Sequence, residues 1–153
     1  LNRAAFGGEE EAQLVDRLRR AGLVIAALVA AEDGEVVGHI LLSDLWVETD
    51  TGGVVRTAAL APMAVAPDRQ RRGIGSRLVD AGLQACRDAG IELVVVLGHP
   101  GYYPRFGFSA ARARHLRAPF SGPAFMALEL TPGVLDGVRA TVRYPDAFGL
   151  EGG

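Results

Sequence analysis

Two glycines and several arginines stand together in the stretch RQRRGIGS at residues 69–76, just before a segment with helical periodicity. The N-terminus of a helix carries about half a positive charge, so cations are unfavourable there unless an anion lies between them and the helix. Gly73 and Gly75 have no Cβ atom, so a ligand can approach the backbone closely. The free N–H groups of a first helical turn form a ready phosphate site, which Arg71 and Arg72 would flank.

The alternative is that these glycines only fit a tight turn and that the arginines are solvated. Two widespread phosphate motifs are excluded. A dinucleotide-binding G-x-G-x-x-G would need glycine where the chain has Leu78, and no Gly-Lys-Ser/Thr follows as in a P-loop. The sequence therefore predicts a local anion site of a different type.

A proline lies in the extended segment that leads to this loop. Residues 60–67 (LAPMAVAP) read as a central strand, yet Pro62 cannot donate a ladder hydrogen bond and belongs at an edge or a bulge. If the strand diverges from its neighbour, backbone groups near Ala64 and Val65 are left unpaired, which is costly unless a ligand pairs with them. A ligand with amides at one end and a pyrophosphate at the other would satisfy both features. Coenzyme A has this make-up.

Three motifs in order carry a family resemblance. Residues 70–75 (QRRGIG) fit the pattern Gln/Arg-x-x-Gly-x-Gly/Ala, residues 63–65 form the strand end before it, and residues 103–108 (YPRFGF) fit Tyr-x-x-x-Gly-Phe after the next strand. The chain resembles the GNAT superfamily of acetyl-CoA-dependent N-acetyltransferases, most closely over residues 54–108. The run at residues 97–108 is similar to a subgroup of predicted acetyltransferases with a poorly defined substrate.

The resemblance implies an acyltransferase in which a primary amine attacks the thioester of acetyl-CoA directly. Backbone groups of the strand end would pair with the pantetheine arm, and the loop and first helical turn would hold the pyrophosphate. The implied cofactor-binding residues are Met63, Ala64, Val65, Arg71, Arg72, Gly73, Ile74, Gly75 and Ser76. The acceptor is expected to be a small-molecule or peptide amine.

Tyr103 is the implied general acid, which would protonate the leaving thiolate. A free thiol has a pKa near 8.5 and a tyrosine near 10, so we expect this proton transfer to be roughly balanced. The alternative for Tyr103 is a core aromatic residue whose hydroxyl finds a partner. Two readings of the adjacent Tyr102 are left open, namely lining the acceptor site and packing.

The general base is not fixed by the sequence. Some family members carry a glutamate on a central strand where the parallel strands part, but residues 60–65 and 94–97 contain no carboxylate here. Four side chains are therefore left as candidates, besides a chain of water molecules: His99, Asp44, Glu48 and His39. His39 follows a glycine inside an apolar strand, where a hydrogen-bonded core histidine is the more common role.

A non-catalytic acyl-CoA-binding or sensor module on the same fold is the alternative function. A nucleic-acid-binding domain is disfavoured, because 16 basic and 18 acidic residues give a net charge of −2. We also expect no membrane partner and no metal site, since no cluster of His, Cys and carboxylate has ligand spacing. One cysteine, Cys86, excludes an intramolecular disulfide and favours a cytoplasmic protein.

The periodicity predicts one α/β (α+β) domain over residues 1–153, with a mixed, mostly antiparallel central sheet flanked by helices. Helices are predicted over 10–19 and 73–89, and strands over 23–31, 35–46, 54–66, 91–97, 125–130 and 138–144. One βαβ crossover should join two parallel, splayed strands. The family normally has a strand before its first helix, which we expect this chain to lack. The strand at 138–144 offers a pairing edge for a homodimer.

Overall fold

The computed structural model describes residues 9–66, 68, 70, 73–119 and 122–145, of which residues 9–12 and 62 are described by their backbone alone. Its elements in chain order are α1 (Glu9–Arg20), β1 (Val24–Glu32), β2 (Glu35–Thr49), β3 (Val54–Val65), α2 (Ile74–Asp88), β4 (Leu93–Leu97), the 3₁₀ helix η2 (Tyr103–Phe106), α3 (Ala110–Ala113), β5 (Leu116–Arg117), β6 (Phe125–Glu129) and β7 (Ala140–Arg143). Each predicted helix and strand is present, with bounds that differ by a few residues.

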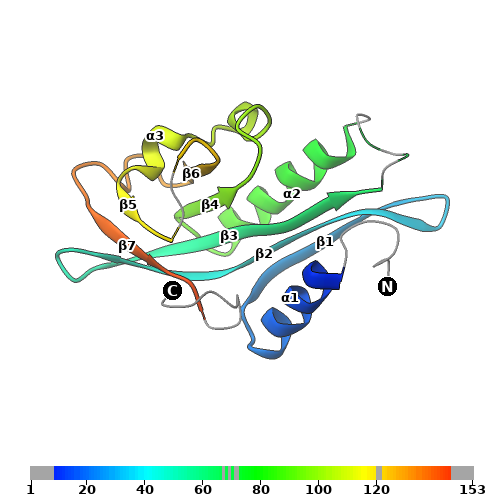
Figure 1. The fold of residues 1–153 in the computed structure, drawn as a ribbon, viewed down its shortest axis with the longest axis horizontal. Coiled ribbons are helices and arrows are strands. Elements are labelled where there is room, and N and C mark those ends of the chain that lie inside the picture. Colours follow the sequence, from blue (N-terminus) through cyan, green and yellow to red (C-terminus); the bar gives the residue numbers. More distant parts are fainter. Residues whose placement is uncertain (1–8, 67, 69, 71–72, 120–121, 146–153) are drawn as a thin grey trace.

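A mixed sheet of seven strands organises the described residues (Figure 1). Its order is β5-β7-β2-β3-β4-β6, and β1 pairs with β2 beside this path. The pairs β3–β4 and β5–β7 are parallel, and the other neighbouring strands are antiparallel. In the view of Figure 1, α2 lies above β2 and β3, and α1 lies below them. This arrangement confirms the predicted mixed fold with one βαβ crossover.

The long strand β2 shares one of its edges between two partners. Its first part pairs with β1, from Glu35 opposite Glu32 up to Ser43 opposite Val24. Its last four residues pair instead with β7. The β1–β2 hairpin turns at Asp33 and Gly34, whose φ angles of +49° and +80° are those of a tight type I′ turn. The Asp-Gly pair predicted this hairpin.

The parallel strands β3 and β4 part halfway along β3. Their pairing ends where Ala59 lies opposite Val95, although β3 continues to Val65. Across β2, the register shifts between Leu60 and Met63, so that one extra residue of β3 is accommodated there. A bulge of this kind bends a strand and tolerates a residue without an N–H, and Pro62 occupies it as expected.

Two apolar layers cover the faces of the sheet. One layer lies against α2 and includes Val94 and Val96 of β4, whereas the other includes Leu93 and Val95. All four side chains are at most 3% exposed. The nearly continuous apolar composition of β4 therefore reflects burial on both faces, as the sequence predicted.

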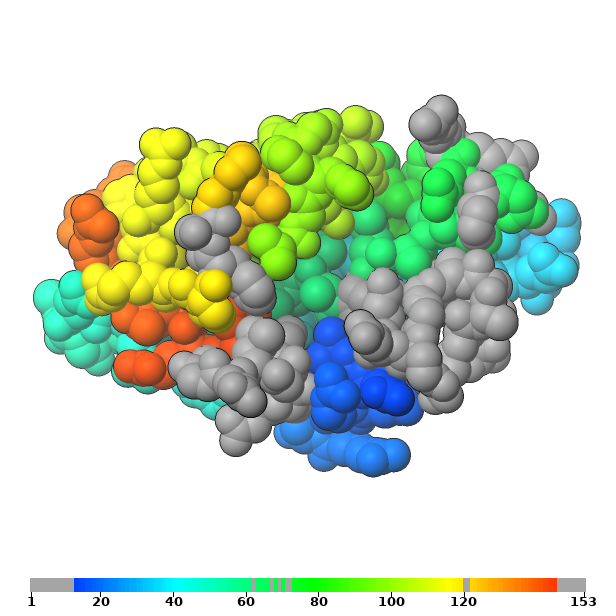
Figure 2. Space-filling model, in the orientation of Figure 1, coloured from blue at the N-terminus to red at the C-terminus, as the bar shows by residue number. Residues whose placement is uncertain are grey.

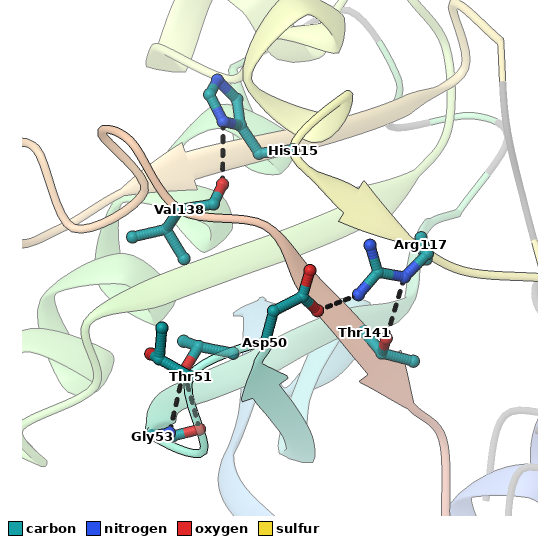
Figure 3. A network of polar contacts seen from close by, with 8 residues as sticks. Asp50, Thr51, Gly53, His115, Arg117, Val138 and Thr141 are labelled. Atoms are coloured by element: carbon teal, nitrogen blue, oxygen red, sulfur yellow. Dashed lines mark hydrogen bonds and ion pairs between the residues drawn. The ribbon is translucent and has the colours of Figure 1, made fainter.

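Polar contacts tie the short strand β5 to its surroundings (Figure 3). Arg117 forms an ion pair with Asp50 of the β2–β3 hairpin, and its Nε donates to Thr141 Oγ1 of β7 at 3.2 Å. The Nδ1 of His115 donates to the Val138 carbonyl oxygen at 3.1 Å. Since β5 covers Ala140 and Thr141, the edge predicted for a homodimer is partly occupied by the chain itself. Among the described residues, no helix is long and apolar enough to cross a membrane.

Candidate active site

The first turn of α2 lies beside the end of β3. The helix begins at Ile74, and its N-cap residue Gly73 has a φ of +81°, in the left-handed region that other L-residues rarely adopt. Gly73 has no side chain with which to cap the turn, and no acidic residue lies in the turn. The N–H groups of a first helical turn have no partner within the helix, so they are suited to bind an anion. Arg71 and Arg72 lie outside the described residues.

The residues of this turn contribute in different ways. Ile74 is 3% exposed and packs into the core, so only its backbone can contact a ligand. Gly75 faces Val65 at the end of β3, because a Cβ atom there would lie 3.7 Å from Val65 Cγ2. Ser76 Oγ lies 3.4 Å from Tyr102 Oη, which comes from the segment after β4. In Figure 2 the green atoms of β3 and early α2 reach the surface beside the yellow-green atoms of that segment.

At the end of β3, alternate residues direct their backbone N–H and C=O groups toward β2 and toward the gap where β4 has parted from β3. The Ala66 N–H donates to the Val37 carbonyl oxygen at 2.7 Å, so this residue turns its hydrogen-bonding groups toward β2. Because neighbouring residues of a strand point their groups to opposite sides, Ala64 also faces β2. Met63 and Val65 then present their N–H and C=O groups to the gap.

Gln70, the first residue of the loop motif, closes this gap at one end. Its Nε2 donates to the Val65 carbonyl oxygen at 3.1 Å. The loop is thereby folded back onto β3, just before α2 starts. A glutamine at this position has a structural role that the motif alone does not reveal.

Tyr103 lies in η2 against the end of β4. Its ring is 7% exposed and packs on the backbone of Gly98, where a Cβ atom would approach Cε2 to 2.5 Å. Phe108 covers another side, with ring centroids 5.7 Å apart. Burial, and to a lesser degree the neighbouring Tyr102, raise the pKa of Tyr103 to about 12. Within the described residues its hydroxyl makes no hydrogen bond, so it is available to a ligand.

Two of the four base candidates lie far from the gap. Asp44 stands opposite Ala58, on the order of 15 Å along the sheet from Met63. Glu48 is farther still, opposite Val54, and its carboxylate forms an ion pair of 3.4 Å with Arg143. The geometry therefore separates both carboxylates from the strand end.

Both remaining candidates are histidines near the gap. His39 of β2 lies opposite Ala64. Its neighbours Gly38 and Ile40 face α2, so its side chain points to the other face of the sheet, and burial lowers its pKa. His99 is exposed in the turn after β4, where its carbonyl oxygen accepts hydrogen bonds from the N–H groups of Tyr102 and Tyr103. His99 thus shapes the turn that holds both tyrosines.

Comparisons with known proteins agree with the fold. The model of the acetyltransferase (GNAT) family matches residues 3–108. The uncharacterised N-acetyltransferase YhbS of Escherichia coli K12 is 35% identical over 151 residues, 97% of this chain and 89% of YhbS. The crystal structure of Escherichia coli YhbS in complex with CoA superposes with a TM-score of 0.84, over 99% of this chain and 84% of that one. A GNAT family acetyltransferase from Brucella melitensis in complex with acetyl-CoA gives 0.71 at 38% identity, over 91% and 78%.

Proposed function

The chain belongs to the GNAT acetyltransferase family, and from this premise we propose that it transfers the acetyl group of acetyl-CoA to a primary amine by direct attack. The observation that carries the proposal is the gap between β3 and β4 beside the first turn of α2, whose N-cap residue is the glycine Gly73. Two relatives with the same fold bind CoA or acetyl-CoA in their crystal structures.

The residues of the gap suit each part of this cosubstrate. The first turn of α2, with Gly73, Ile74, Gly75 and Ser76, would hold the diphosphate by N–H groups and the Ser76 hydroxyl, and Arg71 and Arg72 would add charge. Backbone groups of Met63 and Val65 would pair with the amides of the pantetheine arm. Ala64 would contribute through its position in the strand, since its own groups face β2. The cosubstrate supplies an acetyl group activated as a thioester.

Tyr103 is the proposed acid for the leaving thiolate, and its burial changes the proton balance. A tyrosine with a pKa of about 12 gives up its proton to a thiolate of ordinary pKa near 8.5 only at a cost. The transfer becomes more balanced where the same apolar surroundings raise the pKa of the thiol as well. Tyr103 therefore needs a site without water, in which the pKa of the thiol is raised as well. Its hydroxyl stays protonated at neutral pH.

His39 is the proposed base for the attacking amine. Its pKa is lowered by burial, so the ring is neutral at neutral pH and can accept a proton. It lies level with the strand end, on the face of the sheet away from α2. The amine would then approach from that face, while α2 holds the diphosphate.

The experiment combines binding with turnover. Thermal unfolding is measured with and without CoA, and thiol release from acetyl-CoA is measured with a panel of amines. We expect stabilisation of about 2.7 kcal/mol at CoA concentrations 100 times Kd, together with amine-dependent thiol release. Gly73→Val, which strains the left-handed N-cap, should remove the stabilisation. Stabilisation by CoA without release for any amine would favour the non-catalytic acyl-CoA-binding module, and no stabilisation would refute both functions.

A further inference from the structure

Tyr102 is held firmly by its neighbours, although it lies just outside the Tyr-x-x-x-Gly-Phe motif. Its ring lies edge-on to Tyr103 and Phe106, at centroid distances of 5.1 and 5.3 Å. The Arg105 guanidinium lies 4.6 Å over the ring, and Arg105 Nε donates to the Tyr102 carbonyl oxygen at 3.0 Å. These contacts fix the direction in which the hydroxyl points.

The hydroxyl of Tyr102 reaches across the gap to the first turn of α2. Its distance of 3.4 Å from Ser76 Oγ is longer than the 2.5–3.0 Å of a good hydroxyl–hydroxyl hydrogen bond. Both hydroxyl groups therefore keep most of their capacity to donate. They stand beside the N–H groups of the same turn, whose N-cap residue Gly73 has no side chain.

The same hydroxyl explains why position 75 is a glycine. A Cβ atom there would lie 2.9 Å from Tyr102 Oη, which is too close for a real contact. The next nearest atoms, Val65 Cγ2 at 3.7 Å and Tyr102 Cζ at 3.9 Å, are at ordinary contact distances. A single atom thus creates the restriction, and since the ring is held, the hydroxyl cannot easily move away.

We propose that Tyr102 is a positioning residue that links the diphosphate site at α2 to the turn carrying Tyr103. Its hydroxyl donates, beside Ser76, to the diphosphate of the cosubstrate, while its ring supports Tyr103. This proposal rests on the proposed function, because it presumes that a CoA diphosphate occupies the first turn of α2. The cosubstrate would then tighten the same turn that places the acid.

The first test measures affinity by titration calorimetry with two probes, CoA and pantetheine, which lacks the diphosphate. A hydrogen bond to a charged group accounts for roughly a tenfold or larger change in binding. We expect Tyr102→Phe to raise the Kd of CoA about tenfold and that of pantetheine less than twofold. In turnover, Tyr102→Phe should affect KM for acetyl-CoA more than kcat, and Tyr102→Leu, which also loses the ring, should affect both.

The second test examines the contact with Gly75 without any ligand. Gly75→Ala should lower the thermal unfolding midpoint in the wild-type background. In the Tyr102→Phe background the crowded atom is absent, so the same substitution should cost clearly less. If Gly75→Ala does not fold in the wild-type background but folds in the Tyr102→Phe background, this result supports the proposal in the same way.

Three results would overturn the proposal. The first is an equal effect of Tyr102→Phe on CoA and pantetheine, and the second is a purely additive effect of Gly75→Ala and Tyr102→Phe. Either would leave the proposed function intact, because wild-type binding and turnover would be unaffected by it. The third is a failure of the wild-type protein to bind CoA, which would refute the proposed function itself.

Discussion

Adjacent residues of the candidate site have separate environments. Tyr102 points to the first turn of α2, and Tyr103 is buried against Gly98 and Phe108. Tyr102 is the N-cap residue of η2 and Tyr103 is its first residue, and their rings stand at 83° to each other, so the two side chains can serve two parts of a ligand. The carbonyl oxygen of His99 holds the start of this turn.

Removal of the Tyr103 hydroxyl tests the acid role. We expect Tyr103→Phe to lower kcat by roughly 10²-fold or more, since general acid catalysis typically contributes 10²–10⁴-fold. The ring and its packing are retained, so the Kd of CoA should change little. The measurement is steady-state kinetics with calorimetric binding, and an unchanged kcat would refute the role. Because the pKa of Tyr103 is raised to about 12, its ionisation should not limit kcat below about pH 11.

The two histidines near the gap can be separated by a matched pair of variants. We expect His39→Gln to lower kcat by roughly 10²-fold, and His99→Gln to have a much smaller effect. A base must be neutral, and the lowered pKa of His39 means that protonation removes it only below pH 6.5. The fall of kcat on the acid side should therefore lie below pH 6.5 and be absent in His39→Gln. A larger loss in His99→Gln would reverse the assignment.

At the scale of secondary structure, buried polar contacts hold the elements on the side of the sheet away from α2. Glu129 of β6 is the clearest example, with a side chain 10% exposed. Its Oε2 accepts from the Leu135 N–H at 2.8 Å, and its Oε1 lies 3.3 Å from Arg112 Nε of α3. One carboxylate thus fixes α3 and the segment after β6 to the sheet.

Substitution of Glu129 should therefore destabilise the fold without altering the site. We expect Glu129→Ala to lower the free energy of unfolding by about 1–3 kcal/mol, because a partly buried N–H loses its acceptor. Glu129→Gln keeps an acceptor oxygen and should cost less. Urea unfolding measures both, and equal losses for the two variants would show that charge, not the hydrogen bond, matters.

The sequence predicted the elements with strong local signals and missed those that depend on distant contacts. The Asp33–Gly34 turn, the bulge at Pro62 and the buried strand β4 each follow from residue type and period. The elements α3 and β5, of four and two residues, are too short to have a period of their own. They form because β6 and β7 offer partners.

The site was predicted as a list of positions, and register decided which of them meet. Asp44 and Glu48 share a strand with His39, yet pairing places only His39 level with the gap. Sequence spacing cannot predict which of these residues lies level with the gap, because the answer depends on how β2 aligns with β3. In the sequence, the position of the Tyr102 hydroxyl beside Ser76 is reflected only in the glycine at position 75. The family motif explains this glycine by the approach of the ligand alone.

For the whole molecule, buried groups that must stay neutral set the alkaline limit of stability. Burial raises the pKa of Cys86 to about 11, and the pKa values of Tyr103 and Tyr144 to about 12. In the unfolded chain these groups ionise at their lower, ordinary values. The folded state therefore binds protons that the unfolded state releases, and its stability falls as pH rises from about 9 to 12.

This dependence can be followed by urea unfolding at several pH values. We expect the free energy of unfolding to be nearly constant from pH 7 to 8.5 and to decrease steadily above that. In Cys86→Ala the decrease should begin about one pH unit later, because only the tyrosines then contribute. A free energy that stays constant to pH 11 would contradict the burial of these groups.

Because β3 parts from β4, the second half of β3 has no strand partner on one side, at the centre of the sheet. Gln70 Nε2 already donates to the Val65 carbonyl oxygen, so without a bound ligand water must satisfy the groups of Met63 and the N–H of Val65 that face the gap. A pantetheine arm with its two amides would serve as a temporary strand and complete the ladder. A bound pantetheine arm would therefore complete the hydrogen bonding of the sheet at this point, and its release would return these main-chain groups to water.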